Sequence, residues 1–364
     1  MSKVSRRSRG SVTIQDVARS AGVSAMTVSR VVNGEPNVRD STRQAVQAAI
    51  AQLNYSPNAA ARSLAAGEAT HIGLLYANPS AAYLSQFLIG ALEAARRAGC
   101  HLIVEASESD SADELAEATR SFATTNVEGV ILPPPLSESQ VILAELDAAG
   151  IPVVTVAMGF PRPGSMNVRI DDCAAAAEMT RHLLDLGHRN IGFIRGHPNH
   201  IASHERARGF ALALKEYGIN PAEAAVEQGY FTFRSGLVAA ERLLARRNPP
   251  TAIFASNDDM AAAAVSVMHR RGLSVPGDVS VVGFDDTTIA TTIWPELTTV
   301  KQPIAAMAEA ALDLMLSNIR ARRSGSPAVA ADQVLGHELI VRESSSPPHA
   351  EAAAAGLRAA AGAR

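Results

Sequence analysis

The chain of 364 residues is long enough for two or three domains, and its 47% hydrophobic and 19% charged residues are typical of a folded protein, not a disordered one. Two cysteines, Cys100 and Cys173, are too few for a disulfide framework and favour a reducing compartment. Because there is no run of about 18 apolar residues and no apolar core of a secretory signal at the N-terminus, we expect a cytoplasmic, nucleoid-associated protein with no membrane partner.

The net charge of −3 conceals an uneven distribution. Residues 1–68 hold nine Lys and Arg against four Asp and Glu, whereas the remainder holds 24 against 32. A basic head on an acidic body is typical of a protein that docks one end on a polyanion such as nucleic acid. A solvated charged arm would have the same composition, so charge alone does not decide between the two.

The N-terminal region predicts a flexible basic arm, 1–11, followed by an all-α domain, 12–56. Thr13 begins a capping box that starts the first helix, and Gly22 is expected to end it in the left-handed conformation. Ser24 then caps a second helix, AMTVSRVVN. Two short helices joined by a glycine turn form a helix-turn-helix, whose second helix enters the major groove of DNA, although such turns also occur in other folds.

A third helix is expected from about Ser41, because apolar residues recur there at a spacing of three and four. The residues of this buried stripe are Val46, Ala49, Ile50 and Leu53. Beyond it, residues 57–68 are expected to form a hinge helix and linker, with Pro57 at the first helical position. Such a short helix is not stable alone in water.

From residue 69 the sequence pattern changes to short apolar runs that alternate with amphipathic stretches. The expected strands are 71–76, 101–106, 127–132, 152–157, 190–195, 251–256 and 279–284, and the expected helices lie near 84–98, 111–123, 138–149, 172–186, 204–217, 235–246, 258–272 and 304–320. This alternation predicts parallel, doubly wound α/β sheets. Residues 69–344 are too many for a single sheet with its covering helices, so we expect two lobes with a ligand cleft between them. The Ala-rich tail, 345–364, is expected to be disordered and carries no coiled-coil heptad.

Polar groups at strand ends mark the candidate ligand site. Asp285 follows a buried strand, Asn257 lies at a strand-to-helix turn, and Arg206 lies near a helix start. Carboxylate and guanidinium groups bind hydroxyls, while an aromatic ring such as that of Phe231 stacks on the C–H face of a polyol. Residues after the first strand are also expected to line the cleft; they are Tyr76, Asn78 and Tyr83. The alternative role for the neighbouring aspartates Asp172, Asp258 and Asp286 is helix capping.

Neither a metal site nor catalysis is expected, and no cofactor. His197, His200 and His204 have ligand-like spacing, but Pro198 and the loop context argue against one helical face, and no cysteine joins them. His188 stands apart from these three. No phosphate loop, GxSxG or HExxH motif is present, and no acid–base pair stands out.

The head VTIQDVARSAGVSAMTVSRVVNGEPNV, followed by YSPNAAARSLAAG, resembles the lactose/purine repressor (LacI) family. The resemblance extends from about Val12 to Arg342. It implies a helix-turn-helix head joined to a two-lobed, periplasmic-binding-protein-like core of parallel, doubly wound sheets. It also implies a homodimer that binds double-stranded operator DNA.

The resemblance assigns roles within the head. Ala25 and Met26 occupy the two main base-reading positions, and Arg30 occupies a third, one turn later. An arginine fork suits guanine, whereas Ala25 and Met26 offer only van der Waals contact. Positions that contact phosphates or brace the helix are Thr13, Ser24, Thr27, Ser29 and Asn33.

For the hinge, the resemblance implies a helix that forms only on the operator and pairs with its copy. Leu64 matches the residue that wedges into the minor groove and kinks the duplex. The other hinge residues are Pro57, Asn58, Ala61 and Arg62. The alternative is that Leu64 is an ordinary linker residue packed on the core.

The resemblance also implies that Arg206, Asn257 and Asp285 contact an effector and that Phe231 stacks on it. One departure weakens any claim to a specific sugar: many relatives have an aspartate where this chain has Ala157. We expect a transcriptional regulator, most simply a repressor of a carbohydrate operon, whose DNA affinity is controlled by a sugar-like effector, with a purine-like corepressor as the alternative. A transport solute-binding protein would carry a signal peptide and no basic head, and an enzyme would need a catalytic constellation.

Overall fold

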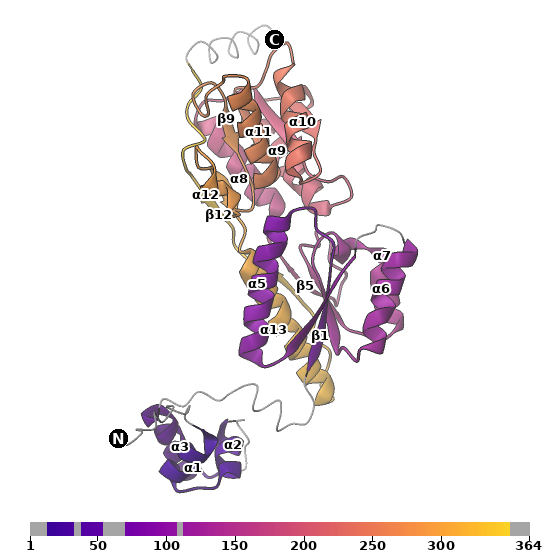
Figure 1. The fold of residues 1–364 in the computed structure, drawn as a ribbon, viewed down its shortest axis with the longest axis vertical. Helices are drawn as coiled ribbons and strands as arrows, with labels where there is room; N and C mark the ends of the chain where they lie inside the picture. The colour runs from indigo at the N-terminus through magenta and orange to yellow at the C-terminus, as the bar shows by residue number, and fades with distance from the viewer. Residues whose placement is uncertain (1–12, 33–37, 54–69, 108–111, 350–364) are drawn as a thin grey trace, which may run out of the picture. The chain divides into compact units, whose positions relative to one another are not determined.

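A computed structural model describes residues 13–32, 38–53, 70–107 and 112–349 (Figure 1). These residues divide into a small helical head and a larger α/β core that begins at Thr70. Within the described residues, no helix is both long and apolar enough to cross a lipid bilayer.

The head consists of α1 (Ile14–Ala21), α2 (Ala25–Val32) and α3 (Asp40–Gln52). All three helices pack around one small core, as the 3–4 spacing of apolar residues predicts. Its fully buried or nearly buried members are Val17, Ala18, Val28, Val31, Val46 and Ala49. Ile50 and Leu53 are partly buried and pack against this core.

The first lobe of the core contains a six-stranded parallel sheet of order β11-β5-β4-β3-β1-β2. Its strands are β1 (His71–Tyr76), β2 (His101–Ala106), β3 (Gly129–Leu132), β4 (Val153–Val156), β5 (Met166–Arg169) and β11 (Ala331–Val334). Its helices are α5 (Ala81–Ala98), α6 (Ala112–Thr124), α7 (Gln140–Ala148) and α13 (Ile304–Arg323). Figure 1 shows α6 and α7 on the opposite side of this sheet from α5 and α13, so both faces are covered and the apolar strands are buried.

The second lobe contains a four-stranded parallel sheet of order β7-β6-β8-β9. Its strands are β6 (Ile191–Arg195), β7 (Ala225–Gln228), β8 (Ala252–Ala255) and β9 (Ser280–Val282). The helices α8 (Asp172–Asp185) and α9 (Ile201–Glu216) pack against each other, as do α10 (Phe233–Leu244) and α11 (Asp258–Arg270) (Figure 1).

The chain passes between the two lobes more than once, because α13 and β11 return to the first lobe after the second sheet is complete. The remaining elements are the short helix α12 (Ile289–Thr292), which packs against α11, and the antiparallel pair β10 (Thr299–Lys301) and β12 (Glu338–Ile340), which contact α8. The two-lobed α/β architecture expected from the alternation of strands and helices is therefore present.

The seven strands and eight core helices expected from the sequence all occur, with bounds that differ by up to three residues. Strands β5, β7, β10, β11 and β12 were not expected, because each has only three or four residues and no continuous apolar run.

The C-terminal boundary of the core lies further along than expected. The prediction that the disordered tail begins at residue 345 is wrong for its first residues. The carbonyl of Ser346 accepts a hydrogen bond from the ring of buried His188 at 2.9 Å, and the hydroxyl of Ser345 lies 3.0 Å from the ring of His182. The second lobe therefore includes these serines.

Candidate functional site

The first candidate site is the helix pair α1–α2 of the head. The carboxylate of Asp16 accepts hydrogen bonds from the amide of Thr13 at 3.0 Å and from its hydroxyl at 2.7 Å. These bonds hold the pKa of Asp16 below its usual range. Gly22 ends α1 with φ of 65°, and the hydroxyl of Ser24 accepts from the amide of Thr27 at the start of α2. The expected capping residues thus build the turn.

The outward face of α2 carries the proposed base-reading side chains. Met26 is 65% exposed, which is unusual for a large apolar residue, and Arg30 is exposed one turn later. Ala25, Thr27 and Ser29 are partly exposed. The buried residues of α2 point to the other side of the helix, so the geometry of the head leaves this face available to a partner.

Several proposed DNA contacts lie outside the described residues. They are Asn33 in the head and, in the hinge, Pro57, Asn58, Ala61, Arg62 and Leu64.

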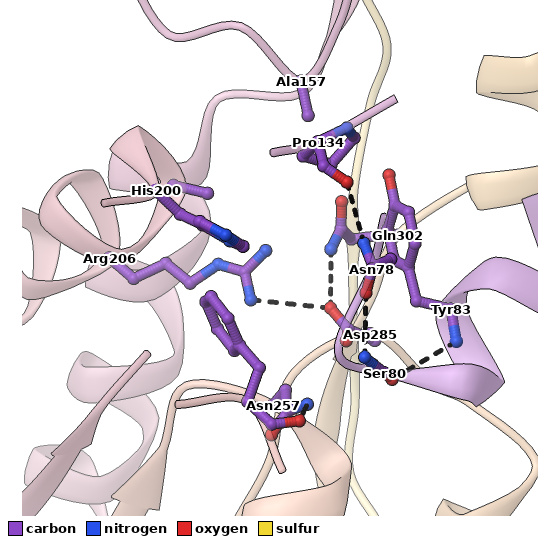
Figure 2. A pocket seen from close by; sticks show the side chains of 12 residues that line it. Asn78, Ser80, Tyr83, Pro134, Ala157, His200, Arg206, Asn257, Asp285 and Gln302 are labelled. Carbon is purple, nitrogen blue, oxygen red and sulfur yellow. Dashed lines mark hydrogen bonds and ion pairs between the residues drawn. The ribbon is translucent and has the colours of Figure 1, made fainter. Parts of the chain in front are cut away.

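The second candidate site is a cavity of about 40 Å³ between the two lobes of the core (Figure 2). Its walls come from loops at the carboxyl ends of strands of both sheets and from the first turns of α5 and α9, the region where open α/β sheets bind ligands. The lining residues are Asn78, Ser80, Tyr83, Pro134, Ala157, His200, Ala202, Arg206, Phe231, Asn257, Asp285 and Gln302. Six of the seven expected effector-binding residues are in this set.

The seventh expected residue, Tyr76, does not line the cavity. It is the last residue of β1 and pairs with Ala106 of β2, so it still belongs to the sheet. The chain turns into the cavity only after this strand ends, at Asn78.

Arg206 and Asp285 form the charged centre of the cavity. Arg206 Nη1 lies 3.5 Å from Asp285 Oδ1, and Arg206 Nε donates to Asp172 Oδ1 at 2.9 Å. The guanidinium also lies on the ring of Phe284, with its central carbon 3.7 Å from the ring centroid. All three charged side chains are buried, so the single guanidinium is held between two carboxylates.

Three lining residues adopt the left-handed backbone region that non-glycine residues rarely occupy. The φ angles are 57° at Ala157, 60° at Phe231 and 114° at Asp285. Such strain persists only where the surrounding structure imposes it, and it concentrates at functional sites. The Phe231 ring also packs so closely on Gly196 that a Cβ there would lie 2.0 Å from it.

The aspartates that could have been helix caps have other roles. Asn257 caps α11, since its side chain accepts from the amide of Met260 at 3.0 Å. The fully buried Asp258 instead accepts from the amide of Thr287 at 2.7 Å and from the hydroxyl of Thr299 at 2.6 Å. The capping role considered for Asp258 is therefore wrong. Asn257 has the extended backbone that an N-cap needs, with φ of −154°, and Asp258 is already the first residue of the helix.

Capping is also wrong for the two other aspartates. Asp171, not Asp172, caps α8, and Asp172 is paired with Arg206. Asp286 forms an ion pair with Arg342 at 2.6 Å. Asp286 therefore does not line the cavity, whereas Asp285 does.

Five lining residues were not expected from the sequence: Ser80, Pro134, His200, Ala202 and Gln302. Gln302 donates to Asp285 Oδ1 at 2.6 Å, and the hydroxyl of Ser80 crosses between the lobes to Asp259 at 2.8 Å. His200 was weighed only as a metal ligand. Its pKa is lowered to about 4 by burial and by neighbouring His197 and Arg206, so it is a neutral ring near pH 7.

The remaining histidines also have ordinary partners. The ring of His204 forms a hydrogen bond with the carbonyl of Pro198, and the ring of His197 lies 4.8 Å from that of His200, centroid to centroid, at a tilt of 34°. In the part of the chain that the structure describes, no group of three or more His, Cys, Asp or Glu side chains is arranged to hold a metal ion.

Comparison with known proteins identifies the family. A model described as "Bacterial regulatory proteins, lacI family" matches residues 13–58, and one described as "Periplasmic binding protein-like domain" matches residues 180–345. Catabolite control protein A of Priestia megaterium is 36% identical over 306 residues, which cover 84% of this chain and 91% of that protein. The chain belongs to the lacI family of bacterial regulatory proteins.

Solved structures of this lacI family agree with the fold. The transcriptional regulator CelR in complex with cellobiose is 32% identical, with a TM-score of 0.70 over 92% of this chain and all of that one. The Lac repressor dimer bound to operator and the anti-inducer ONPF is 29% identical, with a TM-score of 0.69 over 93% of this chain and all of that one. The prediction of a transcriptional regulator with a helix-turn-helix head and a periplasmic-binding-protein-like core is confirmed, and the relatives are regulators, not enzymes.

Proposed function

We propose that this lacI-family regulator binds a pseudo-palindromic operator of about 14–20 base pairs as a homodimer in the cytoplasm. Met26 and Arg30, exposed on α2, read bases in the major groove. Ala25, the first residue of α2, is the third base-reading position. Ser24, Thr27 and Ser29 contact phosphates or brace the helix. The Lac repressor structure, a dimer on its operator, supports this arrangement.

We further propose that a sugar or sugar derivative binds in the cavity and changes operator affinity. The observation that carries this proposal is that both lobes contribute side chains to one cavity, Asn78 and Tyr83 from the first and Arg206 and Asp285 from the second. An occupant therefore contacts both lobes and biases the angle between them. The cellobiose complex of CelR supports a carbohydrate. A coupling of about 1–3 kcal/mol between the two sites would suffice for control.

The hinge completes the proposal, with Leu64 as the minor-groove wedge at the operator centre. Leu64→Ala should weaken operator binding and leave effector binding unchanged. If the variant bound the operator as the parent does, the wedge role would be wrong.

The experiment that tests the function starts from a random duplex library. Full-length protein should enrich one two-fold-symmetric sequence over competitor DNA at moderate salt. Failure to enrich any sequence, with and without a panel of carbohydrates, would contradict the proposal.

A further inference from the structure

The last turn of α13 carries three arginines, Arg320, Arg322 and Arg323. All three are exposed, and the stretch 314–331 around them contains no acidic residue. The rest of the core is acidic, since residues 69–364 hold 24 Lys and Arg against 32 Asp and Glu. The end of α13 is therefore a basic exception on an acidic body.

Little of this positive charge is neutralised within the chain. Arg323 pairs with Glu128 at 2.7 Å. Arg322 donates only to the carbonyl of Gly150, at 3.4 Å, and Arg320 forms no ion pair with a described residue. Arg322 and Arg323 also line an open cavity of about 310 Å³, so a partner can approach their guanidinium groups.

Arginines at a helix C-terminus are favoured by the helix dipole, so their presence alone assigns no function. The helix α10 is followed by a similar run, Arg246 and Arg247, and has Arg242 in its last turn. Both helices end at the amino edges of their sheets, whereas the cavity between the lobes lies at the carboxyl edges. The two runs therefore lie at opposite ends of the core (Figure 1), and position is what distinguishes them.

The α13 end is the one from which the chain continues to the head. Arg323 Nη2 donates to the hydroxyl of Thr70, the first residue of the core that the structure describes, at 3.4 Å. Leu64, the proposed minor-groove wedge, precedes Thr70 by only six residues. Six residues span at most about 22 Å even when fully extended. On the operator, this end of the core must therefore lie close to the wedged base step.

The residues that follow the arginines suit the same partner. Ser324 and Ser326 are exposed, and Gly325 lies between them. Phosphate oxygens of DNA accept hydrogen bonds from arginine and serine side chains and from backbone amides. The α13 end therefore offers the groups that usually contact a nucleic-acid backbone.

We propose that the α13 end, defined as Arg320, Arg322, Ser324 and Ser326, binds backbone phosphates of the operator beside its central minor groove. This inference rests on the proposed function, from which it takes the position of Leu64. Such contacts carry no base specificity, and they offset the repulsion between an acidic core and DNA. A homodimer brings two α13 ends, one to each half of the operator.

The salt dependence of operator binding tests these contacts. The DNA is the operator that full-length protein selects from a random duplex library. Each phosphate contact contributes about 0.9 to the slope of log affinity against log salt concentration. The double variant Arg320→Gln, Arg322→Gln should therefore reduce this slope by about 2–4 in a homodimer, since each contact is lost twice. Relative affinities for single-base variants of the operator should not change.

The matched control is the double variant Arg242→Gln, Arg247→Gln, which removes the same charge from exposed positions at the end of α10. Its slope should equal that of the parent. An unchanged slope in the α13 variant, or an equal reduction in both variants, would overturn the inference and leave the proposed function standing. If the parent selects no operator, the proposed function fails and the inference fails with it.

Ethylation of single phosphates locates the contacts on the DNA. At least one phosphate beside the central minor groove should weaken binding of the parent when it is ethylated, and should not weaken binding of the α13 variant. Identical interference patterns for the two proteins would overturn the inference. Urea unfolding of both variants confirms that they are folded under the conditions of the titration.

Discussion

Glu138 of the first lobe caps the start of α9 in the second, since its two carboxylate oxygens lie 3.1 and 3.0 Å from the amide nitrogen of Ile201, which donates to them. Helix N-termini favour a negative charge at this position. This contact between the lobes lies next to the cavity, which His200 and Ala202 line, so one carboxylate joins the two lobes there.

This contact predicts a pH dependence. Burial, together with the charge of Asp172, raises the pKa of Glu138 to about 7 from an ordinary value of 4.5. A group that binds its proton more tightly in the folded protein than in the unfolded chain stabilises the folded protein as the pH falls. Between pH 6 and 8 the protein should therefore lose stability as Glu138 ionises. His200 stays neutral in this range because its pKa is about 4.

Thermal unfolding of the parent protein and Glu138→Gln measures the effect. From pH 6 to 8 the parent should lose on the order of 1 kcal/mol relative to the variant, a value kept small because Glu138 is partly exposed, which corresponds to about 2–4 °C. Asp172 and Asp285 titrate in both proteins, so the difference isolates Glu138. If the stability of the parent and of Glu138→Gln changed equally with pH, ionisation of Glu138 would have no effect on stability.

Arg30→Ala tests the face of α2. Loss of one bidentate contact to a base should cost about 1–3 kcal/mol in operator binding and relax sequence preference at one base position. Fluorescence anisotropy on the selected operator and its single-base variants measures both effects. Gln47→Ala, on the exposed side of α3, is the control and should change neither. A uniform loss across all sequences would reassign Arg30 to a phosphate contact.

Much of this architecture follows from periodicity. Strands with continuous apolar runs, such as 71–76, and helices with a clear apolar face were predictable because local pattern and burial agree. Strands β5 and β11 were not, since each has only four residues, and their pairing joins Met166 to Ala331 although the whole second sheet lies between them in the sequence. Contacts made over such a separation leave no local signal.

Some cavity residues were also predictable from the sequence, and others were not. Residues at strand ends, such as Asp285 and Asn257, were predictable because parallel sheets bind ligands there. Gln302 comes from a segment that crosses back between the lobes, and its place beside Asp285 depends on that crossing. Whether Asn257 or Asp258 caps α11 depends on a single φ angle, which composition does not encode.

Asp285→Ala tests the coupling of the cavity to DNA. Removal of the carboxylate should abolish the effect of the sugar on operator affinity and leave sugar-free operator binding unchanged. Operator titrations with and without the sugar measure both properties. Asp286→Ala serves as the control with the same charge change, and it should retain the response. A normal response in Asp285→Ala would show that the effector binds elsewhere.

Gly209→Ala tests the packing of α8 on α9. A Cβ at this position would lie 2.1 Å from the carbonyl oxygen of Cys173, so the two helices must separate to admit it. The free energy of unfolding should fall by about 1–3 kcal/mol, as for other overpacked contacts. Urea unfolding measures the loss. Gly336→Ala, which meets open space, is the matched control and should change stability little; equal stability of both variants would contradict the close approach.

The most direct measurement is a titration of the selected operator with full-length protein, repeated with each compound of the sugar panel. At least one sugar should shift operator affinity by about 5–150-fold, and Asp285→Ala should remove the shift. An operator affinity that no compound changes, in a protein shown to bind one of them, would contradict control of the head by the cavity.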